Sequence, residues 1–326
     1  MKKIISLYFV LGCIISVQAQ TDQALTNANR ILSNYVNLDI EEHPGIRNLF
    51  DTAKNSPGDS SAYALIAGGS KGIGFALAEA LAKRKYNLIL IARGMDTLLI
   101  AKNKLESAYP VHVEILSYDL SKEETATEIA KWCTERNIHL KMLCNVAGLG
   151  GSRDYLTLPL DSLRYMVRLN VESMMALSLT LLPLLEKNAP SYILNVASMA
   201  GFAPIPVKNL YSATKAAVIT FSYALRYQLK KKNISVSCLA PGPVYTKPSI
   251  EMETKRQLGW FGDKMSVTPK REGEVAVSKT LKKKTMITPG ALAKILSWVL
   301  RIVPKKWATY IYGKLADRSN RKRPPQ

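Results

Sequence analysis

The chain has 326 residues, of which 47% are hydrophobic and 21% are charged. Such a composition supports a sizeable core and excludes a disordered or collagen-like protein. Four cysteines in this length exclude a disulfide scaffold. The formal net charge of +20 favours an anionic partner, and charge alone does not choose among phosphate ligands, nucleic acids and membrane surfaces.

The first 19 residues have the pattern of a secretory signal. Two lysines precede an apolar run from Ile4 to Val17, and a small residue, Ala19, marks a cleavage point. The run is short for a bilayer span. Cleavage, retention as an anchor and lipidation at Cys13 are alternatives, so the protein is exported, membrane-associated or, if the signal is unused, cytoplasmic. Residues 20–60 are expected to form a polar linker with a short helix.

From residue 61 onwards, short apolar runs alternate with stretches of helical periodicity. The runs predict strands at 62–67, 87–92, 111–116, 139–144, 191–196, 234–239 and 284–288. The periodic stretches predict helices at 72–85, 95–108, 121–136, 160–185, 211–231 and 272–283. Ser121, with Glu124 three residues on, is expected to cap the third of these helices. Continuous apolar strands between amphipathic helices predict an α/β fold with a doubly wound parallel sheet covered on both faces.

A glycine-rich loop links the first predicted strand to the first predicted helix. It offers backbone N–H groups and the positive end of a helix dipole to a pyrophosphate. Because the loop stands between a strand and a helix, as that mechanism requires, it predicts a dinucleotide site near the switch point of the sheet. The contacts expected there are Gly68, Ser70, Lys71, Gly72, Ile73 and Gly74.

The end of the second predicted strand indicates which dinucleotide binds. An NAD site often has an acidic residue there to bond the ribose 2′-hydroxyl. This chain has Ala92 and Arg93 instead, with Lys71 in the glycine loop. Two cations and no carboxylate suit a 2′-phosphate, so NADP(H) is favoured over NAD(H).

A tyrosine and a lysine four residues apart begin the helix predicted at 211–231. Tyr211 and Lys215 share one helix face, and a nearby ammonium is expected to lower the pKa of the phenol. A phenol tuned in this way transfers protons near neutral pH. Ser198 ends the fifth predicted strand, and Asn170 lies in the preceding long helix.

In this order the motifs resemble those of the short-chain dehydrogenase/reductase family over about residues 61–246. The resemblance implies a Rossmann sheet of seven strands in the order 3-2-1-4-5-6-7, and catalysis by Tyr211 as acid or base. Ser198 would polarise the carbonyl, Lys215 would hold the nicotinamide ribose, and Asn170 would position a water. Cofactor contacts would also come from Asp119, Leu120, Asn145, Ala147, Gly148, Tyr211, Lys215, Pro241, Gly242, Val244 and Thr246.

Two positions depart from the family pattern. Ala67 replaces the usual threonine before Gly68, and Val146 replaces the second asparagine of the Asn-Asn-Ala-Gly motif. Both are commonly structural, so activity is expected to survive. The link between the glycine loop and the fourth strand is the feature that they put in doubt.

The catalytic domain is expected at 61–290, with a substrate lid at about 245–271 and a basic helical extension at 291–326. Apolar lid residues suit a lipophilic ketone or alcohol, such as a 3-oxoacyl thioester, a keto-sphingoid base or a steroid. From residue 279 on, 13 Lys and Arg accompany one acidic residue. This extension packs on the domain or a partner, or contacts a membrane surface, after a break at Pro304.

No nucleic-acid motif and no metal site are recognised, and a homo-oligomer is compatible with the pattern. A competing hypothesis is a non-catalytic, nucleotide-binding scaffold at a membrane. The presence of Ser198, Tyr211 and Lys215 together favours the enzyme.

Overall fold

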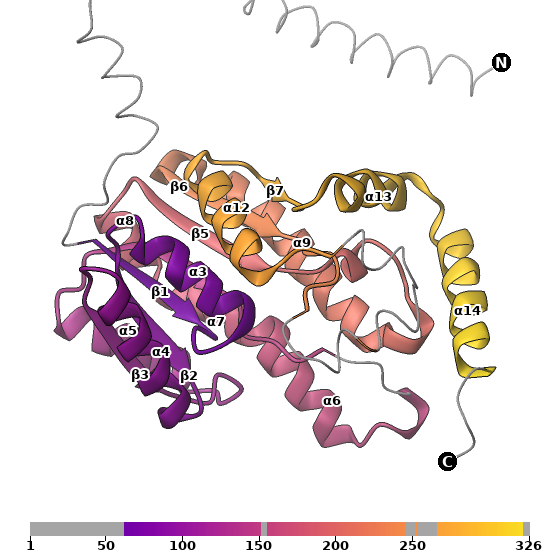
Figure 1. Cartoon of the computed structure of the whole chain (residues 1–326), viewed down its shortest axis with the longest axis horizontal. Helices are drawn as coiled ribbons and strands as arrows, with labels where there is room; N and C mark the ends of the chain where they lie inside the picture. The colour runs from indigo at the N-terminus through magenta and orange to yellow at the C-terminus, as the bar shows by residue number, and fades with distance from the viewer. Residues whose placement is uncertain (1–61, 151–154, 246–251, 253–265, 322–326) are drawn as a thin grey trace, which may run out of the picture. The chain divides into compact units, whose positions relative to one another are not determined.

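The structure, a computed structural model, describes residues 62–150, 155–245, 252 and 266–321, with side chains as far as residue 314. The signal-like segment, the linker, Thr246 and most of the predicted lid lie outside the described residues. What is described begins at the first strand of the predicted catalytic domain (Figure 1).

The described chain forms one parallel sheet of seven strands in the order β3-β2-β1-β4-β5-β6-β7, which confirms the predicted fold. The strands are β1 (Tyr63–Ala67), β2 (Asn87–Ala92), β3 (Val113–Ser117), β4 (Leu140–Asn145), β5 (Ser191–Val196), β6 (Ile234–Leu239) and β7 (Met286–Ile287). Because β1 lies between β2 and β4, the strand order reverses at β1, where the glycine loop follows.

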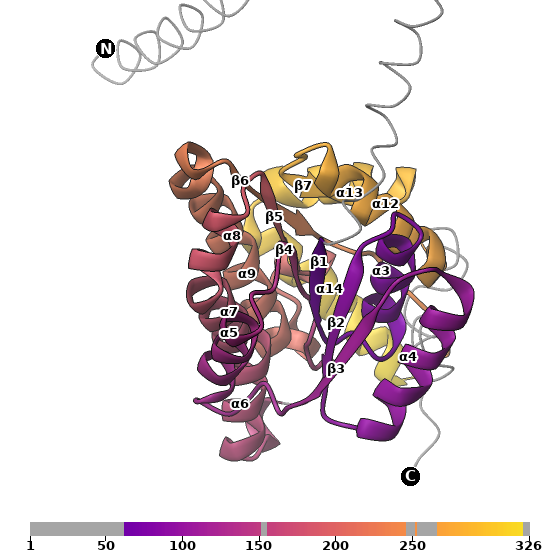
Figure 2. The same ribbon diagram turned by 90° about the vertical axis from the view of Figure 1, so that its left-hand side faces the viewer.

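Two layers of helices cover the sheet, one on each face (Figure 2). The first layer contains α3 (Gly72–Ala82), α4 (Met95–Ala108) and α12 (Pro269–Leu281). The second contains α5 (Thr125–Glu135), α7 (Ser173–Thr180), α8 (Leu182–Lys187) and α9 (Asn209–Leu229). Successive side chains of a strand point to opposite faces of the sheet, so Ile66 packs in the core under the first layer and Leu65 in the core under the second. Cys133, Cys144 and Cys238 are buried and form no disulfide with one another.

The long helix predicted at 160–185 is wrong as a single element. It is divided into α6 (Leu160–Val167), a π-helical turn at Arg168–Glu172, α7 and α8. Pro183 accounts for the last break, because it stands in the first turn of α8 and has no N–H to continue α7. The π turn contains Asn170, and such turns often accompany functional residues.

The capping prediction at Ser121 is also wrong. Helix α5 begins at Thr125, and the Ser121 hydroxyl donates to Asp119 Oδ1 at 2.8 Å instead of capping the helix. A local side-chain bond within the turn has displaced the cap that the Ser121–Glu124 spacing predicted.

The extension forms two helices, α13 (Ala291–Ile302) and α14 (Lys305–Arg321), and the predicted break at Pro304 is confirmed. Ser297 stands at helical spacing with Lys294 and Arg301, and it is only 3% exposed. It donates a hydrogen bond to the Lys294 carbonyl at 2.8 Å, which satisfies its hydroxyl and lets it pack inward.

Candidate active site

The glycine loop after β1 is built so closely that two of its glycines admit no side chain. Gly68 has a φ of +92°, and a Cβ there would lie 2.8 Å from Ala147 N. A Cβ on Gly74 would lie 1.9 Å from the Gly68 carbonyl oxygen. The missing Cβ atoms therefore let the loop fold against the start of α3, which leaves its backbone accessible to a phosphate.

Backbone hydrogen bonds hold this loop to both neighbouring strands. The Gly68 N–H donates to the Ile91 carbonyl at 2.8 Å. The Ala67 carbonyl accepts from Val146 N at 3.0 Å and from Ala147 N at 2.7 Å. The two departures from the family pattern therefore leave the backbone link between the loop and β4 intact.

The start of α3 fits a negatively charged group. Its first turn contains no acidic residue, and Lys71, its N-cap residue, is exposed. Ser70, Gly72 and Ile73 are partly buried around the same turn. This glycine loop and helix N-terminus fit a dinucleotide cofactor of the kind the sequence predicts.

Arg93 follows β2 at the same edge of the sheet, since β1 and β2 pair in parallel register up to Ala67 and Ile91. Its Nη1 donates to the Tyr165 hydroxyl at 2.8 Å, and the pair lies on the surface. Sequence reasoning missed Tyr165. Only the fold brings α6 next to the end of β2.

The next predicted contacts, Asp119 and Leu120, form the turn after β3. Asp119 Oδ1 accepts from Ser121 N at 3.0 Å and from Ser121 Oγ at 2.8 Å, so this carboxylate also organises the turn. Leu120 is 6% exposed and packs in the core of the second layer.

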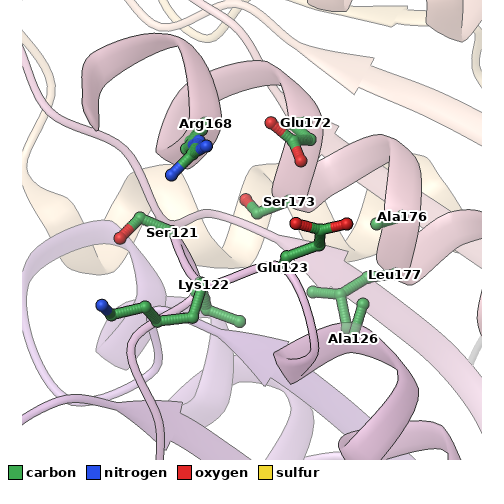
Figure 3. A pocket seen from close by; sticks show the side chains of 10 residues that line it. Ser121, Lys122, Glu123, Ala126, Arg168, Glu172, Ser173, Ala176 and Leu177 are labelled. Carbon is green, nitrogen blue, oxygen red and sulfur yellow. The ribbon is translucent and has the colours of Figure 1, made fainter. Parts of the chain in front are cut away.

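Beyond this turn, a small pocket lies between residues 120–126 and the segment 168–177 (Figure 3). Its charged lining residues are Lys122, Glu123, Arg168 and Glu172, so two cations are balanced by two carboxylates. This balance gives no preference for an anion, and we assign the pocket no role. Among the described residues, no His, Cys, Asp and Glu side chains gather in a group that could hold a metal.

Asn145 takes part in a buried polar network near the carboxyl ends of β4 and β5. Its Nδ2 donates to Asn195 Oδ1 at 2.9 Å and to Ser178 Oγ at 3.1 Å, and Asn195 Nδ2 donates to Ser222 Oγ at 3.0 Å. The network joins β4, β5, α7 and α9. Apart from Asn145, its members were not predicted, because they are dispersed over 78 positions from Asn145 to Ser222 and form no local motif.

Asn170 is 1% exposed and positions two other segments. Its Oδ1 accepts from Leu149 N at 2.7 Å, and its Nδ2 donates to the Leu149 carbonyl at 2.9 Å and to Thr214 Oγ1 at 3.1 Å. Thr214 Oγ1 donates in turn to the Tyr211 carbonyl at 2.8 Å. Both N–H groups of the amide are thus used to connect the π turn to the loop after β4 and to α9.

Tyr211 and Ser198 come together at the carboxyl end of β5. Ser198 begins the 3₁₀ turn η4 (Met199–Gly201), where its Oγ accepts from Ala200 N at 3.2 Å. Burial raises the pKa of the Tyr211 phenol, while a hydrogen bond with the Ser198 side chain acts in the opposite direction. The net direction is opposite to the lowering that the Tyr211–Lys215 spacing predicts.

Lys215 is 4% exposed, and its Nζ donates to the Val196 carbonyl at 2.8 Å. This Nζ lies 5.9 Å from the centroid of the Tyr211 ring. Burial lowers the pKa of the Lys215 ammonium to about 8, with a smaller opposing effect from Cys238. The lysine is therefore poised to lose or keep its proton close to neutral pH.

Gly148 brings the β4 side of the site to the same point. A Cβ on Gly148 would lie 3.2 Å from Asn170 Oδ1 and 3.3 Å from Lys215 Nζ. On the other side, the Pro241 carbonyl accepts from Met199 N at 3.0 Å, next to Ser198. The segment after β6, with Gly242 and the buried Val244, thus lies beside the turn that follows Ser198. The predicted site residues from four separate stretches of sequence converge.

Comparisons with known proteins agree with this geometry. The model of the short chain dehydrogenase family matches residues 62–257. A very-long-chain 3-oxoacyl-CoA reductase of Danio rerio is 31% identical over 189 residues, which cover 57% of this chain and 59% of the relative. A reductase of the same name from Mus musculus is 32% identical over 57% of this chain and 60% of its own length. The chain thus matches about three fifths of these curated relatives.

Solved structures show the same fold. The L-sorbose reductase of Gluconobacter frateurii, complexed with NADPH and L-sorbose, superposes with a TM-score of 0.63 at 24% identity, covering 70% of this chain and 94% of that one. A 7beta-hydroxysteroid dehydrogenase superposes with a TM-score of 0.70 at 20% identity, covering 77% and 96%. With its strand order, its glycine loop and the match over 62–257, the chain belongs to the short-chain dehydrogenase family.

Proposed function

We propose that this protein is an NADP(H)-dependent oxidoreductase that interconverts a ketone and a secondary alcohol on a lipophilic substrate. The observation that carries the proposal is the convergence of Tyr211, Ser198 and Lys215 at the edge that bears the glycine loop. A non-catalytic scaffold would have no use for a lysine buried against the ring of a tyrosine, since desolvating an ammonium is costly.

In this reaction Tyr211 holds the transferable proton at its hydroxyl oxygen. In reduction it donates this proton to the carbonyl oxygen of the substrate, and in oxidation it accepts it from the alcohol. Ser198 donates a hydrogen bond that polarises the same oxygen. Burial raises the pKa of Tyr211, so the phenol keeps its proton at neutral pH and can act as the proton donor.

When bound, the nicotinamide ring supplies or accepts the hydride. Lys215 is assigned to the nicotinamide ribose, and Asn170 to the alignment of α9 with the loop after β4. The water relay predicted for Asn170 would have to use groups other than its two amide N–H groups, which are already bonded.

The preference for NADP(H) rests on Arg93 and Lys71. Both are exposed cations at the carboxyl edge of adjacent strands, where the 2′-phosphate of such a cofactor would lie. Arg93 would have to be shared between the phosphate and Tyr165.

For the substrate, we favour a 3-oxoacyl thioester over a keto-sphingoid base or a steroid. The relatives named very-long-chain 3-oxoacyl-CoA reductase support this choice. The excess of cations in the chain also suits a substrate with an anionic carrier group.

The test is Tyr211→Phe, which removes the proton-bearing hydroxyl and keeps the ring. We expect turnover with NADPH and lipophilic 3-oxo substrates to fall by about 10²- to 10⁴-fold, while NADPH affinity changes little. Tyr223→Phe is the matched control, since Tyr223 lies on the same helix and is 43% exposed. Full turnover in Tyr211→Phe would contradict the mechanism and leave the scaffold hypothesis.

A further inference from the structure

The outer faces of α13 and α14 expose large apolar side chains that no described part of the domain covers. On α13 the exposed fractions are 62% for Ile295, 65% for Trp298 and 61% for Ile302. On α14 they are 68% for Trp307 and 64% for Tyr310. Val299 and Ile311 join them, at 38% and 53%.

Helical spacing gathers these side chains into one stripe on each helix. Ile295, Trp298, Val299 and Ile302 follow the i, i+3, i+4, i+7 pattern on α13. Trp307, Tyr310, Ile311 and Lys314 follow it on α14. Each helix therefore has one continuous outer face, which we call its outer stripe.

The inner faces of the same helices carry small residues. Ala293 and Ala308 are 0% and 3% exposed, and Gly313 lies against Pro206 of the turn η5 (Pro206–Lys208). The Arg301 guanidinium lies 4.5 Å from the centroid of the Phe202 ring. Packing thus fixes which way the helices face, and it leaves the large apolar residues named above exposed, while Leu296, Leu300 and Tyr312 are partly buried. A surface helix of a globular protein normally does the reverse.

The sequence that contains the outer stripes is basic. From residue 282 to 314 the sequence contains Lys282, Lys283, Lys284, Lys294, Arg301, Lys305, Lys306 and Lys314, and no Asp or Glu. On α13, the exposed Lys294 stands next to Ile295, and on α14 the Lys314 Nζ lies 5.1 Å from the centroid of the Tyr310 ring. Long basic side chains beside apolar ones can reach headgroups while their stems stay in apolar surroundings.

We propose that the outer stripes of α13 and α14 dock this domain on an anionic phospholipid surface. Tryptophan and tyrosine prefer the headgroup level, and basic amphipathic helices lie in the plane of the interface. No helix in the described part of the chain is both long and apolar enough to cross a bilayer.

A second copy of the chain fits the stripes less well. In a two-fold contact the same surface meets itself, so the cations from Lys294 to Lys314 would face their own copies, and that stretch contains no carboxylate. An anionic bilayer supplies the missing countercharge. The docking proposal does not depend on the proposed reaction, and its test does not measure turnover.

The experiment measures tryptophan quenching in the full chain mixed with phosphatidylcholine vesicles that contain brominated acyl chains, with and without phosphatidylglycerol. We expect quenching with phosphatidylglycerol, and its loss in Trp298→Phe/Trp307→Phe. Trp132 and Trp260 remain in that variant and report any contact made elsewhere. Equal quenching in the wild-type chain and the variant would overturn the proposal, even if another segment binds the vesicles.

The contribution of the basic residues is tested by Lys305→Glu/Lys306→Glu. At low salt this variant should lower, by about tenfold or more, the part of the quenching that comes from Trp298 and Trp307. The matched control is Lys230→Glu/Lys231→Glu, an exposed pair in the turn after α9. Equal loss in both variants would show a non-specific charge effect and overturn the assignment to α14.

Sedimentation without vesicles is the final check. A dimer that Trp298→Phe/Trp307→Phe dissociates would identify a second copy as the occupant of the outer stripes and would overturn the docking proposal.

Discussion

The carboxyl edge of the sheet and the helix pair α13 and α14 differ in the burial of their characteristic side chains. At the sheet edge, Asn170 and Lys215 are almost fully buried and hydrogen-bonded: Asn170 Oδ1 accepts from Leu149 N at 2.7 Å, and Lys215 Nζ donates to the Val196 carbonyl at 2.8 Å. On α13 and α14 the largest side chains, Trp298 and Trp307, lie in solvent. The first region is held by internal complementarity, and the second presents a surface whose complement is outside the described domain.

The two regions therefore should respond differently to substitution. At the sheet edge, a small change should disturb both the fold and the proposed chemistry, because even a Cβ added at Gly148 would lie 3.2 Å from Asn170 Oδ1 and 3.3 Å from Lys215 Nζ. On the outer stripes, a change should leave the fold intact and alter only what the protein binds. The following predictions test this contrast, from the largest expected effect to the smallest.

Gly74→Ala should have the largest effect. Its Cβ would lie 1.9 Å from the Gly68 carbonyl oxygen, so the glycine loop must open or the helix must shift. We expect NADPH affinity, measured by fluorescence titration, to fall by more than about 100-fold, which corresponds to roughly 3 kcal/mol. Gly94→Ala is the control, because its Cβ meets only the Thr97 side chain, at 3.2 Å. Wild-type affinity in Gly74→Ala would refute the assignment of the loop.

Glu272→Gln should stabilise the protein at alkaline pH. Glu272 is 1% exposed on α12, and burial raises the pKa of its carboxyl group to about 7. The folded state therefore binds more protons than the unfolded state between the ordinary pKa of about 4.5 and 7, so stability falls as pH rises through that window. The loss, present in full above pH 7, is roughly 3 kcal/mol, and the glutamine variant should escape it.

The measurement for Glu272 is urea unfolding at acidic and mildly alkaline pH. Glu274→Gln is a close control, because Glu274 lies two residues away and pairs with Arg84 at 2.9 Å and Lys83 at 3.5 Å. This control should not gain stability at high pH. An unchanged pH dependence in Glu272→Gln would mean that this carboxyl does not control it.

Arg93→Asp should weaken NADPH by about 10- to 100-fold and NADH only slightly, because it replaces a cation next to the proposed 2′-phosphate position with an anion. Isothermal titration with both cofactors measures the ratio. Tyr165→Phe removes only the hydroxyl to which Arg93 donates. It therefore tests the orientation of the guanidinium while the positive charge stays in place. Equal weakening of both cofactors by Arg93→Asp would refute the 2′-phosphate assignment.

Trp307→Ser should have the smallest effect on stability, within about 0.5 kcal/mol, because an exposed side chain loses few contacts. Its neighbour Ala308 is 3% exposed, so Ala308→Leu should cost about 1–3 kcal/mol through overpacking. Urea unfolding compares the two variants. A large loss in Trp307→Ser would show that the outer stripe is part of the internal core.

Much of the site was predictable because local motifs and strand periodicity carry it. The glycine loop, Ser198 and the Tyr211–Lys215 pair all lie at strand ends or helix starts that the apolar pattern marks. The shift in the pKa of Tyr211 was not predictable. Its direction depends on burial, which the four-residue spacing to Lys215 does not report.

The sequence by itself determined the alternation of strands and helices and hence the doubly wound parallel sheet, while the strand order, which the structure confirms, and the set of site residues followed from the resemblance to the family. Only the tertiary structure decided the break of the long helix around Asn170, the Asn145–Asn195 network and the outward turn of Trp298 and Trp307. Each of these depends on contacts between segments far apart in the chain. An amphipathic pattern gives the two faces of a helix, but packing against a neighbour selects the face that is buried.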